Sequence, residues 1–190
     1  VIDQAQEMAT RLGHPHALAM AVAAAGVAAY HIGKFRDSMQ LMDRADGIFR
    51  DGCPGSPWER AMCELFVAID RFYLGEIREL GVRSSRVVAE ADERGDLFQS
   101  DTVRVQGLCT VALAQDRPLE VDETLSAAID RWPNGGYVHD CAGPLLQTRV
   151  RLYVEDGPGA RVASQELWRR AEGAGLLHNQ HQRLEVVHIQ

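Results

Sequence analysis

Two short segments that contain paired histidines are the first candidates for chemistry. HPH occupies residues 14–16 and HNQH residues 178–181, and two imidazoles can begin a zinc site. Zinc needs about four ligands, or three in a catalytic site, and neither segment is accompanied by an HExxH pattern or by a nearby set of cysteines and carboxylates. His14 and His16 instead flank Pro15, a residue that favours the first turn of a helix. We therefore expect no metal and no other cofactor.

The residues that transfer phosphoryl or acyl groups do not form a recognisable pattern either. Lys34 is the sole lysine, and Gly26 lies seven residues before Gly33, so the GxxxxGK spacing of a phosphate-binding loop is not met. The sequence has no catalytic loop, metal-binding DFG motif or Gly-rich loop of a protein kinase. No serine stands in a GxSxG-like turn. We therefore expect a chain that is not itself an enzyme.

Charge and hydropathy exclude two classes of partner. The 190-residue chain has a net charge of -7, from 27 acidic and 20 basic residues, whereas a general nucleic-acid binder needs a basic surface. No apolar run approaches the roughly 18 residues that cross a bilayer. We expect neither nucleic acid nor membrane among the partners.

The four cysteines indicate the compartment of the protein, and the two ends of the sequence indicate a fragment. Four cysteines are far apart and follow no CxxC or zinc-type spacing: Cys53, Cys63, Cys109 and Cys141. Such isolated cysteines are typical of buried, reduced thiols, which predicts a cytoplasmic protein. The sequence begins at Val1 rather than at a methionine, and its last residues still follow a helical pattern. Both features predict a fragment of a longer chain.

An internal repeat indicates the fold. Residues that follow the apolar end of a helix recur with separations of 42, 41 and 41, at Gly33, Gly75, Asp116 and Gly157. A second set follows charged amphipathic segments at a spacing close to two such periods, at Gly13, Gly95 and Gly175. Periods of this length are typical of solenoids. Because the sequence shows no strand-like alternation, each period predicts a helical hairpin.

The repeat predicts one all-α domain that covers residues 1–190. We expect four hairpins with a helix before them and another after them. The hairpins are predicted at about 17–51, 57–94, 98–132 and 138–173, and the flanking helices at 1–12 and 177–190. Stacked antiparallel hairpins of this kind form a right-handed superhelix.

The first hairpin resembles the tetratricopeptide repeat, although its period is longer than the one usual in that family. Gly26 matches the small position where the first helix is crossed closely by the second, and Gly33 matches the turn. Phe35 matches the aromatic residue that opens the second helix, and Ala45 matches the small position late in it. A side chain larger than Gly26 would push the two helices beyond the usual 8–10 Å separation.

Other positions depart from that pattern, and the longer unit suggests a narrower resemblance. Ser38 replaces the usual alanine, and Asp116 and Pro118 replace a glycine and an aromatic residue. The segments MATRLGHPHALAMA and FYLGEIREL look similar to the C-terminal helical regions of large bacterial serine/threonine kinases and of signal-responsive ATPase transcription regulators. That resemblance implies a regulatory region rather than a catalytic one.

In such a stack the first helix of each hairpin lines a concave groove. The repeat phase places twelve residues there: Met20, Val27, Tyr30, His31, Met62, Leu65, Ile69, Tyr73, Gln106, Thr110, Gln147 and Arg151. Methionine and aromatic side chains suit an adaptable apolar peptide. The alternative is that these side chains only pack against neighbouring repeats of the longer chain.

Three functions follow from these features. The first is a noncatalytic protein-interaction or regulatory module of a multidomain bacterial serine/threonine kinase or related regulator. Its partner would be a protein or peptide, including other domains of its own parent chain. The second is a small-ligand sensor domain of an ATPase-type transcription regulator, and the third is a helical enzyme with an unrecognised site.

Overall fold

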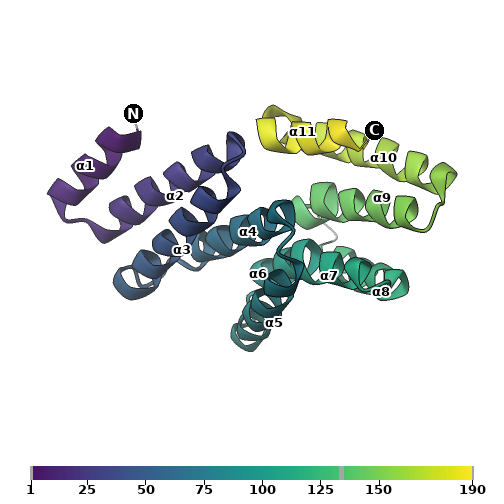
Figure 1. Ribbon diagram of the computed structural model, residues 1–190, viewed down its shortest axis with the longest axis horizontal. Coiled ribbons are helices and arrows are strands. Elements are labelled where there is room, and N and C mark those ends of the chain that lie inside the picture. Colours follow the sequence, from purple (N-terminus) through teal and green to yellow (C-terminus); the bar gives the residue numbers. More distant parts are fainter. Residues whose placement is uncertain (1, 133–134, 190) are drawn as a thin grey trace. The chain divides into compact units, whose positions relative to one another are not determined.

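The computed structural model describes residues 2–132 and 135–189, and in these ranges every regular element is a helix (Figure 1). The first elements are α1 (Ile2–Leu12), α2 (Pro15–His31), α3 (Phe35–Gly52), α4 (Pro57–Leu74), α5 (Ile77–Arg94), α6 (Leu97–Val103) and the π-helical turn η1 (Arg104–Leu108). They are followed by α7 (Cys109–Ala114), α8 (Pro118–Asp130), a second π-helical turn η2 (Val138–Ala142), α9 (Gly143–Tyr153), α10 (Gly157–Gly173), the 3-10 turn η3 (Leu176–His178) and α11 (Gln180–His188). The predicted all-α class is confirmed for this part of the chain.

The chain divides into two compact units, residues 1–99 and 100–190, and the boundary falls inside α6. The sequence predicts one repeat domain over the same residues, and that organisation stays a prediction. No described helix is both long enough and apolar enough to cross a membrane.

In the first unit, α2 carries apolar side chains around most of its circumference, and α1, α3 and α4 each pack against part of its surface. It has no acidic residue, lysine or arginine between Pro15 and His31. By contrast, α3 alternates charged and apolar residues at helical spacing, and its apolar face buries Met42 and Phe49. These two side chains join Val22 of α2 and Val67 of α4 in one core.

Five turns between helices share one geometry, at Gly33, Gly75, Gly95, Asp116 and Glu155, and four of them fall at the repeat positions. At the four repeat positions the residue one or two places after the helix has a positive φ, at Gly33, Gly75, Asp116 and Glu155. In each turn its N–H donates to the carbonyl three residues back, and the next N–H donates to the carbonyl five residues before itself, as in a Schellman cap. The first two separations agree with the sequence pattern, and the third is two residues shorter than predicted.

Gly157 is not the turn residue, so the third predicted separation, from Asp116 to Gly157, is wrong. Gly157 opens α10 instead, followed by Pro158, where a missing N–H costs no helical hydrogen bond. The Asp156 carboxylate accepts from the Gly159 N–H at 2.9 Å and caps this helix. Glu155, with φ of 60°, holds the place that a glycine holds in the first two turns.

The second unit contains the two π-helical turns, which the sequence pattern does not predict. At η2 the Gly143 N–H closes the wide turn onto the Val138 carbonyl, and a Cβ on Gly143 would lie only 2.6 Å from that oxygen. The turn therefore requires glycine at this position. Gln106 of η1 donates from Nε2 to the Tyr137 hydroxyl at 3.0 Å, next to η2.

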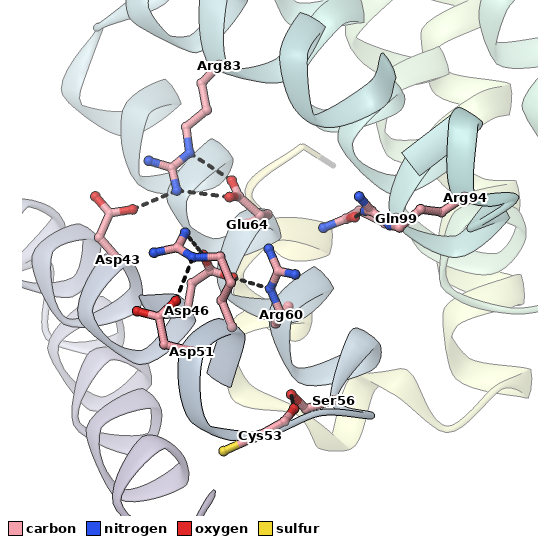
Figure 2. Close-up of polar contacts among 11 residues, drawn as sticks. Asp43, Asp46, Asp51, Cys53, Ser56, Arg60, Glu64, Arg83, Arg94 and Gln99 are labelled. Atoms are coloured by element: carbon pink, nitrogen blue, oxygen red, sulfur yellow. Dashed lines mark hydrogen bonds and ion pairs between the residues drawn. The ribbon is translucent and has the colours of Figure 1, made fainter. Parts of the chain in front are cut away.

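An ion-pair cluster links three helices of the first unit (Figure 2). Arg83 of α5 donates through Nε to Glu64 of α4 at 2.7 Å and through Nη2 to Asp43 of α3 at 2.6 Å. Arg60 of α4 donates through Nε to Asp46 of α3 at 2.8 Å. Asp46 and Glu64 are buried, so their carboxylates have lost most of their contact with water. The arginines compensate for that loss with an opposite charge. The cluster holds α3, α4 and α5 together.

Candidate functional site

An apolar pocket lies between α2, α3 and α4 in the first unit, with a volume of about 350 Å³. Its walls consist mainly of methionine, alanine and aromatic side chains. The lining residues are Met20, Ala23, Ala24, Val27, Met42, Phe49, Trp58, Glu59, Met62, Cys63 and Phe66. Three of the five methionines of the chain are among them. Their flexible thioethers can adjust to apolar groups of different shape.

Gly26 allows Met42 to reach its place in the pocket wall. A Cβ on Gly26 would lie 2.9 Å from Met42 Cε and 3.3 Å from Met42 Cγ, which is closer than side-chain atoms normally approach. The group that lies close to Gly26 is the Met42 side chain of the second helix, so the small residue has a packing reason there, while the close crossing of the two helices stays a prediction. A glycine in the middle of α2 thus lets α3 place a long side chain beneath this helix.

The polar edge of the pocket is formed by Glu59 in the first turn of α4. Its Oε1 lies 3.0 Å from His16 Nε2, and the imidazole packs edge-on against Phe49 with ring centroids 5.5 Å apart. The hydrogen bond from His16 is the largest cause that lowers the pKa of Glu59, so this carboxyl remains charged near neutral pH. Trp58 precedes it and is 59% exposed.

The thiol in the pocket wall is not suited to act as a nucleophile. Cys63 is buried, and burial together with the nearby carboxylates of Asp46 and Glu64 raises the pKa of its thiol to about 12. A thiol is a nucleophile only as the thiolate, so Cys63 acts here as a small apolar side chain. The arrangement is suited to binding apolar groups.

Three of the predicted groove residues, Met20, Val27 and Met62, line this pocket. The other residues predicted on α2 and α4 lie elsewhere. Tyr30, Leu65 and Ile69 are buried, so their placement on an open surface is corrected to the interior.

An aromatic cluster explains the burial of Tyr30. Its ring lies 5.4 Å from Phe66, 5.7 Å from Phe35 and 6.2 Å from Tyr73 by centroid. Tyr73 stacks on Phe35 at 4.7 Å and keeps 41% of its surface exposed. His31, next along α2, is also exposed. The aromatic cluster joins the C-terminal ends of α2 and α4 to the N-terminal end of α3.

The last four predicted groove residues belong to the second unit. Gln106 is engaged with Tyr137, and the Thr110 hydroxyl donates to the Gln106 carbonyl at 2.8 Å within its own helix. Arg151 lies 3.8 Å from Asp156, and Gln147 is partly buried. Their role in partner binding stays a prediction.

The histidine segments do not form metal sites in the described part of the chain. His14 Nδ1 accepts from the Ala17 N–H at 3.3 Å and so caps α2, while His16 pairs with Glu59. Among the described side chains no three His, Cys, Asp or Glu residues come together in a metal-binding group. The side chain of His181 lies outside the described residues.

Comparison with protein families, with curated proteins and with solved structures found no match for this chain. Only the geometry of the pocket therefore bears on its role. Sequence reasoning missed Trp58, Glu59 and Phe66 as lining residues. Phe66 and Glu59 lie one turn from Met62 on α4, at the i+4 and i−3 positions, so helical spacing around Met62 was the signal that could have found them.

Proposed function

We propose that this chain is a noncatalytic protein-interaction module with a stack of helical hairpins of tetratricopeptide type. We also propose that the chain is part of a larger cytoplasmic signalling protein of bacteria, either a serine/threonine kinase or an ATPase-type regulator. The observation that carries the binding role is the apolar pocket between α2, α3 and α4. A pocket with methionine and aromatic walls suits an apolar side chain of a partner segment.

Two further observations support the proposal. Within the four predicted hairpins, turns of one hydrogen-bond geometry recur at nearly equal spacing, at Gly33, Gly75, Asp116 and Glu155, and a fifth such turn at Gly95 lies between two hairpins. Such recurrence is expected when one hairpin unit is repeated along a solenoid. All four cysteines are free and buried, as is usual for thiols in a reducing compartment.

A small-ligand sensor is the second candidate, and the size of the pocket favours it. A volume of about 350 Å³ falls at the lower end of the roughly 300–1,000 Å³ that small-molecule sites span. A ligand of that kind would remain bound during gentle purification. Native mass spectrometry should then show an added mass on the chain.

A pocket-blocking variant tests the leading proposal. Ala24 lines the pocket and is exposed, so Ala24→Trp should fill the space with little strain on the core. Peptides selected from a displayed random library on the wild-type chain should lose binding to this variant. They should keep binding to Ala89→Trp, a matched change at an exposed alanine of α5.

The outcome separates the candidates. Peptides that bind wild type and Ala89→Trp but not Ala24→Trp support the interaction module. A selection that yields no peptide sensitive to Ala24→Trp contradicts it. A copurified small molecule that is absent from Ala24→Trp would favour the sensor.

A further inference from the structure

We propose that the partner segment bound in the pocket carries a basic side chain beside its apolar anchor, and that this arginine or lysine pairs with Glu59. This inference rests on the proposed function and names the chemistry of the partner. The bulky apolar side chain enters between α2 and α4, and the basic group stays at the edge of the pocket.

Charge complementarity is the first argument. Glu59 is the only acidic or basic side chain that lines the pocket within the described chain, and the rest of the lining is apolar apart from the neutral Cys63 thiol. The α2 wall contributes no lysine or arginine. A partner with a carboxylate near its anchor would therefore meet one negative charge and no strong cation.

Glu59 is placed to accept a stronger partner than the one it has. Its side chain is 22% exposed, and the group that it contacts is the His16 imidazole, which is itself 43% exposed. A guanidinium offers two parallel donors to a carboxylate and remains protonated at all physiological pH values. An incoming arginine can thus take over the contact at the solvent side of Glu59.

Trp58 supplies a second feature that favours a cation. Its indole lines the same pocket next to Glu59 in the first turn of α4 and is largely exposed. The face of an indole attracts ammonium and guanidinium groups. One carboxylate and one exposed indole at the same edge select a positive charge beside an apolar anchor.

The test follows from peptides selected on the wild-type chain and counter-selected on Ala24→Trp, so that only pocket-dependent binders are kept. A selected peptide and the same peptide with its basic residue replaced by glutamine are titrated by fluorescence anisotropy. The proteins are wild type, Glu59→Gln and a matched control, Glu79→Gln, which removes an exposed carboxylate of α5. Circular dichroism melts check that the three chains fold alike.

We expect the pocket-dependent peptides to be enriched in arginine or lysine next to a bulky apolar residue. Loss of that basic residue should weaken binding to wild type and Glu79→Gln by about three- to tenfold, the range of a partly exposed charged contact. It should have no effect with Glu59→Gln. Equal loss in all three proteins, or binders without basic residues, overturns the inference while the docking function stands. A selection with no pocket-dependent peptide overturns both.

Discussion

Among single residues, Asp70 is the one whose charge is least compatible with its surroundings. It lies in α4, has no exposed surface, and neither of its carboxylate oxygens forms a hydrogen bond in the described structure. Burial raises the pKa of Asp70 to about 7, and its interaction with the Ser38 hydroxyl lowers the pKa by less. The folded chain therefore holds this proton more tightly than the unfolded chain does.

We predict that this stabilisation is complete below about pH 4 and is lost as the pH rises through the folded-state pKa. Asp70→Asn removes the titration and keeps the size of the side chain. Between pH 5 and pH 8, the free energy of unfolding of wild type should fall by roughly 1–3 kcal/mol relative to the variant. Urea denaturation at both pH values measures it, and parallel pH profiles for the two proteins would contradict the prediction.

Gly26 gives a prediction about packing. Because a Cβ there meets the tip of the Met42 side chain, Gly26→Leu should overpack the α2–α3 contact and destabilise the chain by roughly 1–3 kcal/mol. Gly26→Ala should change stability little, since the flexible Met42 tip can move and alanine favours the helix. Thermal melts compare the two variants. If Met42→Ala partly restores the thermal stability of Gly26→Leu, the strain lies at the contact between these two residues. A double variant that is no more stable than Gly26→Leu would contradict this account.

At the scale of elements, the Schellman turns differ in the residue that adopts positive φ. Glu155 has φ of 60° without the freedom of glycine, and a left-handed conformation costs an ordinary L-residue about 1 kcal/mol. Glu155→Gly should therefore stabilise the chain by roughly 0.5–1 kcal/mol, whereas Gly75→Ala should destabilise it by a similar amount. Chemical denaturation measures both, and a loss of stability in Glu155→Gly would be the contrary result.

The sequence predicted the helices well because most of their ends are marked by glycine or proline. Gly33, Gly75 and Gly95 end helices as expected, since the left-handed turn favours glycine. The fourth turn was misplaced because Glu155 adopts that conformation while a glycine stands two residues later. The π-helical turns were not predictable, since they depend on contacts rather than on local propensity.

The candidate site was predicted in part. Helical phase grouped Met20, Val27 and Met62 among the groove residues, and in the structure all three line one pocket. The prediction was wrong for Tyr30. Helical spacing shows which face of a helix a residue lies on, but not that Phe35 and Phe66 of neighbouring helices cover the Tyr30 ring. Glu59 was not predicted, because only the folded structure shows that this carboxylate lies at the edge of an apolar pocket.

At the scale of the whole molecule, the first compact unit has its own core and contains every residue of the pocket. A chain of residues 1–95, which ends after α5 and before α6, should therefore fold alone with a cooperative thermal transition. It should bind the selected peptides with an affinity within about threefold of the full chain. A non-cooperative melt, or loss of peptide binding, would contradict this prediction.

The central claim is that the pocket between α2, α3 and α4 receives an apolar group of a partner. The five methionines provide its most direct test, since Met20, Met42 and Met62 line the pocket whereas Met8 and Met39 do not. With carbon-13-labelled methionine methyl groups, a pocket-dependent peptide is titrated into the full chain and followed by nuclear magnetic resonance. The account predicts shifts of the Met20, Met42 and Met62 signals, with Met8 and Met39 unchanged. Shifts at Met8 or Met39 with the three pocket methionines unmoved would contradict it.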